Sequence, residues 1–272
     1  MGTKTYDELD FTDDFLFCRI LEEKEDLCIE LAELITGRKI KSIVRPESQK
    51  SIRLTRDGKG VRFDVYFADD EETVYDIEMQ TVKRKGLPKR SRYYQGMIDL
   101  NITSRKMKYH ELPESYIIFI CTFDEFKRGR HVYTFENRCI EDPTLGLDDG
   151  SHKIFLCAKG TEDDCSEKMK EFLDYVAGKG VCGELSRKLE EEVQHSKSQE
   201  KWRLDYMTLE EKYEEKYEEG MEKGKAEGKA EEKADIAKNL IRLGKLSFKE
   251  IAGCSGMTVS EIEALAEKIR IR

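Results

Sequence analysis

The stretch RFDVYFADDEETVYDIEMQTVKRK, residues 62–85, decides the local fold of this chain. Two short runs rich in β-branched and aromatic residues flank the turn-forming ADDEE, and this pattern predicts a β-hairpin. If Asp64 lies directly opposite Glu78 on the neighbouring strand, then Phe67 lies opposite Tyr75, which leaves a three-residue loop of ordinary length. The sequence therefore predicts a hairpin that brings two acidic side chains side by side.

The predicted pairing also gathers polar side chains on one face of the hairpin. Because side chains alternate between faces, Asp76, Glu78 and Gln80 lie on the same face as Asp64. Directly opposed carboxylates have Cβ atoms about 5 Å apart and repel each other. A divalent cation removes that repulsion, and Mg²⁺ suits one or two carboxylates completed by water and phosphate oxygens. Alternating acidic and apolar residues are also typical of any solvated strand face, so the spacing alone leaves both interpretations open.

The segment that follows the hairpin is strongly basic. Residues 83–109 contain nine Lys or Arg and one acidic residue, Asp99, in a chain whose net charge is −9. A carboxylate pair next to a basic, tyrosine-bearing segment fits a cation held against the phosphates of DNA. The alternative is a solvated basic face that offsets acidic neighbours. The residues expected to bind nucleic acid are Lys83, Arg84, Lys85, Lys89, Arg90, Arg92, Tyr93 and Tyr94.

The pattern of the first 195 residues alternates between helix and strand. Residues 14–36 carry apolar side chains at helical spacing and precede Gly37, which predicts one helix. Residues 88–109 begin with a proline and predict another. The runs SYIIFICTF, HVYTFEN and HKIFLCA predict three more strands, and SEKMKEFLDYVAG predicts a helix that ends at Gly178. Residues 1–195 are therefore expected to form an α/β or α+β sheet domain.

The composition changes towards the C-terminus. Residues 196–243 consist mostly of charged helix formers and predict one long solvated helix or linker. Its Gly220, Gly224 and Gly228 indicate either an exposed spacer that tolerates glycine or a close approach to a second helix, hence a homodimer. Residues 244–272 carry two capping-box patterns around a turn, which predicts a small helix-turn-helix-like pair. Its five basic and four acidic residues favour protein contact over DNA reading.

Composition excludes several classes of protein. With 57 acidic and 48 basic residues, the chain is not a globally basic, histone-like DNA binder. No run approaches the roughly 20 apolar residues of a membrane span, and the N-terminal residues lack a secretion-signal pattern. Eight cysteines occur without a C-x-x-C pair, which indicates reduced thiols rather than disulfides or a zinc site. We expect a cytoplasmic protein without membrane association or zinc.

Several blocks of the sequence resemble a known family. Asp64 followed on the next strand by Glu78-Met79-Gln80 is similar to the D…(D/E)-x-K core of PD-(D/E)XK nucleases. The blocks TDDFLFCRIL, VRFDVYF, VYDIEMQ, LPKRSRYYQGMID, IIFICTFD and YTFENRC resemble the PD-(D/E)XK family transposases, a group also described as recombination-promoting nucleases. The resemblance covers roughly residues 10–205. It implies a restriction-endonuclease-like fold, with a central mixed sheet flanked by helices.

The resemblance also implies an activity and a cofactor. The expected reaction is endonucleolytic hydrolysis of DNA phosphodiester bonds with Mg²⁺, or alternatively Mn²⁺, in recombination, element mobility or defence. Asp64 and Glu78 match the motif acids and are the implied metal ligands, together with the Met79 carbonyl. Gln80 occupies the motif lysine position, and its amide can orient a water but carries no positive charge. The residues that could supply that charge are Lys83, Arg90 and Arg92. The family often adds an acid from the first helix, and the candidates are Asp14, Glu30 and Glu33.

Two other hypotheses stand beside the endonuclease. The replacement of the motif lysine by Gln80 favours a catalytically weak nucleic-acid-binding protein on the same fold. The long charged helix and the terminal helical pair favour an oligomeric scaffold without enzymatic activity. DNA binding without nicking in the presence of Mg²⁺ or Mn²⁺ distinguishes a binder from an endonuclease.

Overall fold

The computed structural model describes residues 4–44, 47–52, 60–103 and 107–270. The chain forms two units, Met1–Arg203 and Leu204–Arg272. Residues 104–106 of the basic segment lie outside the described residues.

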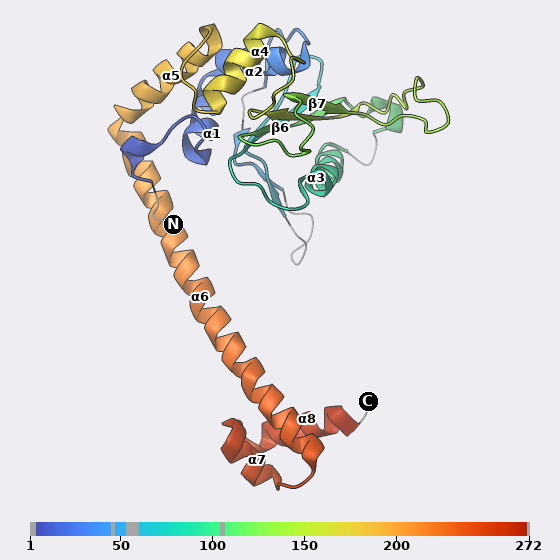
Figure 1. Ribbon diagram of the computed structural model, residues 1–272, viewed down its shortest axis with the longest axis vertical. Helices are drawn as coiled ribbons and strands as arrows, with labels where there is room; N and C mark the ends of the chain where they lie inside the picture. Colours follow the sequence, from blue (N-terminus) through green and yellow to red (C-terminus); the bar gives the residue numbers. More distant parts are fainter. Residues whose placement is uncertain (1–3, 45–46, 53–59, 104–106, 271–272) are drawn as a thin grey trace. The chain divides into compact units, whose positions relative to one another are not determined.

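A six-stranded mixed sheet forms the centre of the first unit, with the strand order β1-β4-β5-β6-β8-β7 (Figure 1). The middle strands β5, β6 and β8 are parallel to one another, whereas β1, β4 and β7 pair antiparallel with their neighbours. The strands are β1 Glu47–Ser48, β4 Val65–Ala68, β5 Val74–Gln80, β6 Ser115–Cys121, β7 Val132–Phe135 and β8 Ser151–Cys157. Two further short strands, β2 Ser51–Ile52 and β3 Val61–Arg62, pair with each other. The sheet confirms the fold class predicted from the sequence.

The hairpin between β4 and β5 has the predicted register. Phe67 lies opposite Tyr75, and their rings stack with centroids 4.9 Å apart. The turn is held by the buried carboxylate of Asp69, which accepts hydrogen bonds from the backbone N–H groups of Glu71 and Thr73 at 2.9 Å each. The same carboxylate accepts a hydrogen bond from the Tyr75 hydroxyl at 2.9 Å. One aspartate thus fixes the loop length, and the loop length fixes the register of every later pair.

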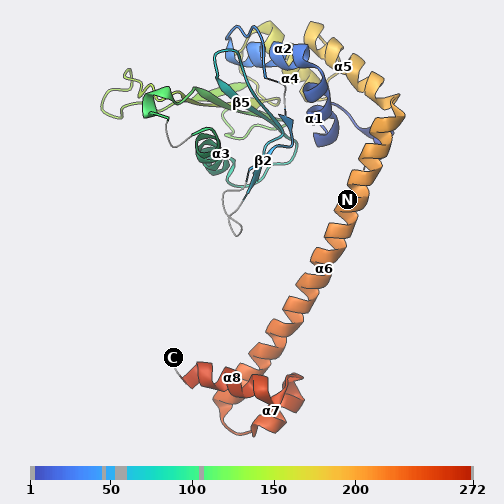
Figure 2. The same ribbon diagram turned by 180° about the vertical axis from the view of Figure 1, so that it is seen from behind.

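Helices cover both faces of the sheet. Figure 2 shows α3 on one face and α1, α2, α4 and α5 on the other. The helices are α1 Asp14–Glu23, α2 Glu25–Thr36, α3 Leu87–Ile102, α4 Glu167–Val176 and α5 Glu184–Lys197. Tyr94, Met97 and Ile98 of α3 are buried with Ile117 and Phe119 of β6 in one hydrophobic cluster. Because helices cover both sides, β6 is almost continuously apolar, whereas β5 carries Asp76, Glu78 and Gln80 at alternate positions.

Two of the predicted helices have different limits in the structure. The single helix predicted over residues 14–36 is wrong, because the chain leaves the helical conformation at Lys24 and forms two helices. At the break, the Lys24 ammonium pairs with Glu192 of α5 at 2.8 Å. The helix predicted over residues 88–109 ends earlier, at Ile102.

The second unit contains most of α6 (Glu200–Leu243), with α7 (Phe248–Ser255) and α8 (Val259–Arg270). Capping boxes begin α7 and α8, since the Ser247 N–H donates to Glu250 at 2.8 Å and the Thr258 N–H donates to Glu261 at 2.7 Å. A small core joins the last turns of α6 to this pair, and its buried members are Ala237, Ile251 and Ile262. Among the described residues, no helix combines the length and the apolar character that crossing a membrane requires.

Candidate active site

Each of the two acidic side chains of the hairpin accepts a hydrogen bond from a backbone N–H group on the opposite side of the hairpin. The Asp64 N–H donates a hydrogen bond to Glu78 Oε1 at 3.1 Å, and the Met79 N–H donates one to Asp64 Oδ2 at 3.1 Å. The side chains are 7% and 0% exposed, respectively. Each carboxylate therefore takes its position from the backbone of the opposite strand, and the register of the hairpin sets the geometry of the pair.

Burial makes both carboxyl groups reluctant to ionise. Loss of solvent raises the pKa of Asp64 to about 7, and the nearby negative charge of Asp14 acts in the same direction. Burial likewise raises the pKa of Glu78 to about 8, with a further contribution from the charge of Asp64, while Arg90 opposes the shift. A divalent cation between such groups stabilises their ionised forms and releases protons on binding. The donor set of buried carboxylate oxygens fits a hard cation such as Mg²⁺.

A cation from α3 lies against this pair. The Arg90 guanidinium donates hydrogen bonds to Glu78 Oε2 and, at 3.2 Å, to the side-chain oxygen of Gln80. Its Nε donates to the Tyr94 hydroxyl at 2.9 Å, and the guanidinium also lies 5.5 Å from the centroid of the Phe119 ring. Among the three basic residues expected to replace the motif lysine, the structure thus places Arg90 at the acid pair.

The amide of Gln80 is fully oriented by its neighbours. Its nitrogen donates to the Met79 carbonyl at 2.9 Å and faces Glu78 Oε2 at 3.4 Å, while its oxygen accepts from Arg90. The Met79 carbonyl, which the family pattern implies as a metal ligand, keeps its second lone pair beside this hydrogen bond. The amide and the guanidinium together occupy the region where the motif places one lysine.

The first helix contributes one acid to this place. Potential ligand atoms of Asp14 and Asp64 lie within 4.8 Å of each other, and Asp14 Oδ2 pairs with Arg62 at 3.1 Å. The other two candidates, Glu30 and Glu33, line a different cavity between α2, α4 and α5. The structure therefore brings together Asp14, Asp64 and Glu78, and separates them from the two glutamates of α2.

The basic residues that were expected to bind DNA differ in whether their side chains are bonded to the rest of the protein. The side chains of Arg84, Lys85, Lys89 and Arg92 are exposed, with no hydrogen bond or ion pair among the described residues. Lys83 is different, since its ammonium donates to the carbonyl oxygens of Asp124 and Glu125 at 2.9 and 2.7 Å.

The two tyrosines of α3 differ in the same way. Tyr93 is 40% exposed, whereas Tyr94 is 7% exposed and its hydroxyl donates to the Arg62 carbonyl at 3.4 Å. The expectation that Tyr94 binds nucleic acid does not agree with the burial of its side chain. Its ring belongs to the core, and its hydroxyl positions Arg90.

Two residues near the acid pair, Asp76 and Cys18, were not among the site residues predicted from the sequence. Asp76 shares the strand face of Glu78, but it is fully buried, and neither carboxylate oxygen has a hydrogen-bond partner among the described residues. Burial raises the pKa of Asp76 well above the usual range, and the negative charges of Glu78 and Asp64 raise it further. Cys18 lies one helical turn after Asp14, and this i, i+4 spacing is the signal that could have revealed it.

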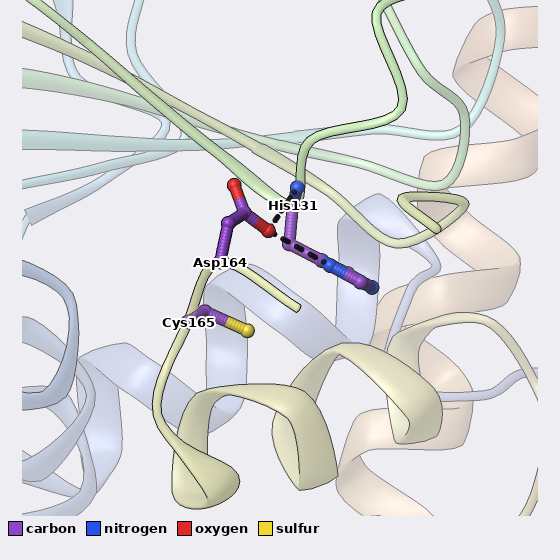
Figure 3. Close-up of side chains that lie close together, drawn as sticks. All are labelled: His131, Asp164 and Cys165. Carbon is purple, nitrogen blue, oxygen red and sulfur yellow. Dashed lines mark hydrogen bonds and ion pairs between the residues drawn. The ribbon is translucent and has the colours of Figure 1, made fainter. Parts of the chain in front are cut away.

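A second group of potential ligands lies at the start of β7 and consists of His131, Asp164 and Cys165 (Figure 3). Asp164 Oδ1 accepts the His131 N–H at 3.0 Å and lies 3.1 Å from His131 Nδ1. Its Oδ2 pairs with Arg130 at 3.2 Å. Both carboxylate oxygens are thus used to hold the loops before β7 and after β8 together, which gives this cluster a structural role.

Comparison with known proteins gives one match. A model of the PD-(D/E)XK nuclease family transposases matches residues 11–146, which is half of the 272 residues and includes α1, the hairpin and α3. No curated protein and no solved structure matches the chain.

Proposed function

This chain belongs to the PD-(D/E)XK nuclease family transposases, and on that premise we propose that it is a metal-dependent DNA endonuclease. The observation that carries the proposal is the reciprocal pair of Asp64 and Glu78, buried beside the cation of Arg90. Asp64 and Glu78 would hold Mg²⁺, or alternatively Mn²⁺, with Asp14 as a third carboxylate. Such a cation, when bound, polarises the scissile phosphate and lowers the pKa of a bound water.

The protein's own residues have distinct roles in this proposal. Arg90 stays protonated at any physiological pH and supplies the positive charge that Gln80 lacks. The Gln80 amide, fixed by Arg90 and by the Met79 carbonyl, orients a water at the acid pair. Tyr94 holds Arg90 through its hydroxyl and is a positioning residue.

The experiment that tests the proposal is plasmid nicking by the full-length protein in Mg²⁺ or Mn²⁺, with EDTA as the control. Nicking that EDTA abolishes supports the endonuclease. Because Gln80 replaces the motif lysine, a catalytically weak DNA-binding protein is the second candidate, and DNA binding without nicking supports that one. The process served, whether recombination, element mobility or defence, is proposed from the family membership.

The exposed basic residues after β5 are proposed to contact DNA phosphates. A Lys85→Ala/Lys89→Ala/Arg92→Ala variant should bind DNA more weakly, because three exposed charges on and before α3 are removed. The slope of log affinity against log salt should flatten by about 0.9 for each phosphate that the variant no longer neutralises. Fluorescence anisotropy at several salt concentrations measures this slope.

Lys83→Ala is the matched control, because the Lys83 ammonium is already bound to two backbone carbonyls. Its salt slope should stay close to that of the wild-type protein. An unchanged slope in the triple variant would remove this surface from the DNA interface.

The long helix α6 is proposed to form a homodimer, an arrangement that suits cleavage of both strands of a duplex. All side chains from 211 to 233 are exposed, and a Cβ atom at Gly220, Gly224 or Gly228 would meet no atom within 4 Å. Replacing these glycines by alanine should stabilise the helix by about 1 kcal/mol each. It should also weaken a dimer that depends on close helix approach.

Sedimentation equilibrium of the full-length protein and the triple alanine variant separates these effects. We expect a dimer for the wild-type chain and a higher dissociation constant for the variant. A wild-type chain that stays monomeric at micromolar concentration contradicts the proposal.

A further inference from the structure

A thiol lies beside the carboxylates of the candidate metal centre. Cys18 follows Asp14 by one turn of α1, and its Sγ lies 3.7 Å from Asp14 Oδ1. The Cys18 side chain is 1% exposed, whereas Asp14 is partly open to solvent. Potential ligand atoms of Asp14, Cys18 and Asp64 all lie within 4.8 Å of one another. Three potential donors therefore lie close together, and the side chain of one of them, Asp14, is partly exposed to solvent.

The one donor distance that is known fits a tetrahedral ion, and the other two donor pairs lie within 4.8 Å. Zinc binds thiolate sulfur at about 2.3 Å and carboxylate oxygen at about 2.1 Å, which places tetrahedral ligand atoms about 3.5 Å apart. The sulfur-to-oxygen distance of 3.7 Å between Cys18 and Asp14 is close to that separation. A thiolate favours Zn²⁺ over Mg²⁺, which prefers oxygen donors.

The charges of the surrounding groups also match a divalent ion. Asp14, Asp64 and a Cys18 thiolate together carry three negative charges. Arg62, which is paired with Asp14 Oδ2 at 3.1 Å, and one Zn²⁺ together carry three positive charges. The thiol proton, and any proton held by the Asp64 carboxyl, leave to solvent on binding, because metal ligands bind in their deprotonated forms.

We propose that Asp14, Cys18 and Asp64 form a zinc site that overlaps the catalytic metal site, and that zinc bound there inhibits the nuclease. Zinc occupies Asp64, which is then no longer available to the catalytic cation. The inhibitory part of this inference rests on the proposed function, whereas the zinc site itself does not. The expectation of no zinc rested on ligand spacing along the sequence, and this site joins α1 to a residue 50 positions from Asp14.

Cobalt is the probe that tests the site, because Co²⁺ bound to a thiolate has a charge-transfer band in the near ultraviolet. We expect the band in the full-length wild-type protein, its loss on addition of Zn²⁺, and its absence in Cys18→Ala and Cys18→Ser. Cys28→Ala is the matched control, since Cys28 is an equally buried cysteine in the neighbouring helix α2. Cys165→Ala removes the thiol of the other cluster. Both controls should keep the band.

Calorimetry gives the size of the effect. Loss of the thiolate should weaken zinc binding by about 100-fold or more. Removing a residue that only supports a metal ligand typically lowers metal affinity by about 10–100-fold, and loss of a direct ligand should cost at least as much. Zinc should raise the thermal midpoint of the wild-type protein and of both control variants, but not that of Cys18→Ala or Cys18→Ser. A band that persists in the Cys18 variants, or no band in the wild-type protein, overturns the zinc site.

Nicking in Mg²⁺ with added Zn²⁺ tests the inhibition separately. For each variant, the activity with zinc is divided by its own activity in Mg²⁺ alone, and the loss should be smaller in Cys18→Ala than in Cys28→Ala. Equal losses in the two variants overturn the inhibitory role. If the wild-type protein shows a Cys18-dependent band but no nicking, the zinc site stands and the proposed endonuclease fails. If it nicks DNA without a band, the endonuclease stands and the zinc site fails.

Discussion

Asp64→Asn and Glu78→Gln should each reduce plasmid nicking by about 10³-fold or more, which corresponds to about 4 kcal/mol of lost transition-state stabilisation. Each change removes a negative charge from the pair that would hold the catalytic cation. Each also keeps an oxygen that can accept the backbone hydrogen bond now made to the carboxylate. The variants should therefore fold normally, and their affinity for DNA should be unchanged or higher. Initial nicking rates, circular dichroism and anisotropy measure these three properties.

Asp76→Asn is the matched control for this prediction. It removes a carboxyl group from the same strand face, two residues before Glu78, but Asp76 lies opposite Tyr66 rather than opposite Asp64. The Asp76 carboxyl is fully buried, and burial raises its pKa well above the usual range, which disfavours the charged form that this change removes. We expect a loss in activity of less than about tenfold, within the range of a modest packing effect. Wild-type nicking by Glu78→Gln would refute the site assignment, even though the family membership would still stand.

Arg90→Gln should reduce nicking by about 10²–10³-fold, the effect typical of losing one electrostatic donor at the transition state. The guanidinium is bonded to Glu78, Gln80 and the Tyr94 hydroxyl, and its side chain is 33% exposed and so able to meet a phosphate. Gln80→Lys places a cation on β5 itself, at the position of the motif lysine. The double variant Gln80→Lys/Arg90→Gln should therefore recover part of the activity that Arg90→Gln loses.

Arg92→Gln is the control for charge alone, because Arg92 lies two residues further along α3 with an exposed side chain. It should change DNA affinity slightly and the turnover number little. In Arg90→Gln we expect the turnover number to fall more than KM rises, since the guanidinium acts in the transition state. A double variant no faster than Arg90→Gln would show that the charge has no catalytic role and that Arg90 only neutralises Glu78.

The hairpin and the pairing of Asp64 with Glu78 could be predicted from the sequence. Both follow from local rules, since a short turn and the two-residue period of a strand leave one register for the pattern around Phe67 and Tyr75. The parity that places Gln80 on the face of Glu78 follows from the same period. A sheet domain of the α/β or α+β class also follows from apolar runs and the spacing of helices, which are properties of neighbouring residues, whereas the mixed sheet was implied by the family resemblance.

The sequence could not predict which charged side chains reach the acid pair. Asp14, Glu30 and Glu33 all precede the hairpin, and only the packing of α1 against β4 and the break at Lys24 bring Asp14 beside Asp64. Likewise, the helical pattern after the hairpin gives no sign that α3 lies over the face that carries Glu78.

Tertiary structure alone therefore decided the roles of the residues that surround the acid pair. The packing of α3 on the sheet face that carries Glu78 buries Tyr94 and Asp76 and brings the guanidinium of Arg90 into contact with Glu78. Lys83 is instead hydrogen-bonded to the loop after β6. It also places Cys18 within reach of Asp64. The physical reason is range: turns and strand alternation are set by adjacent residues, whereas burial and charge pairing depend on contacts between segments far apart in the chain.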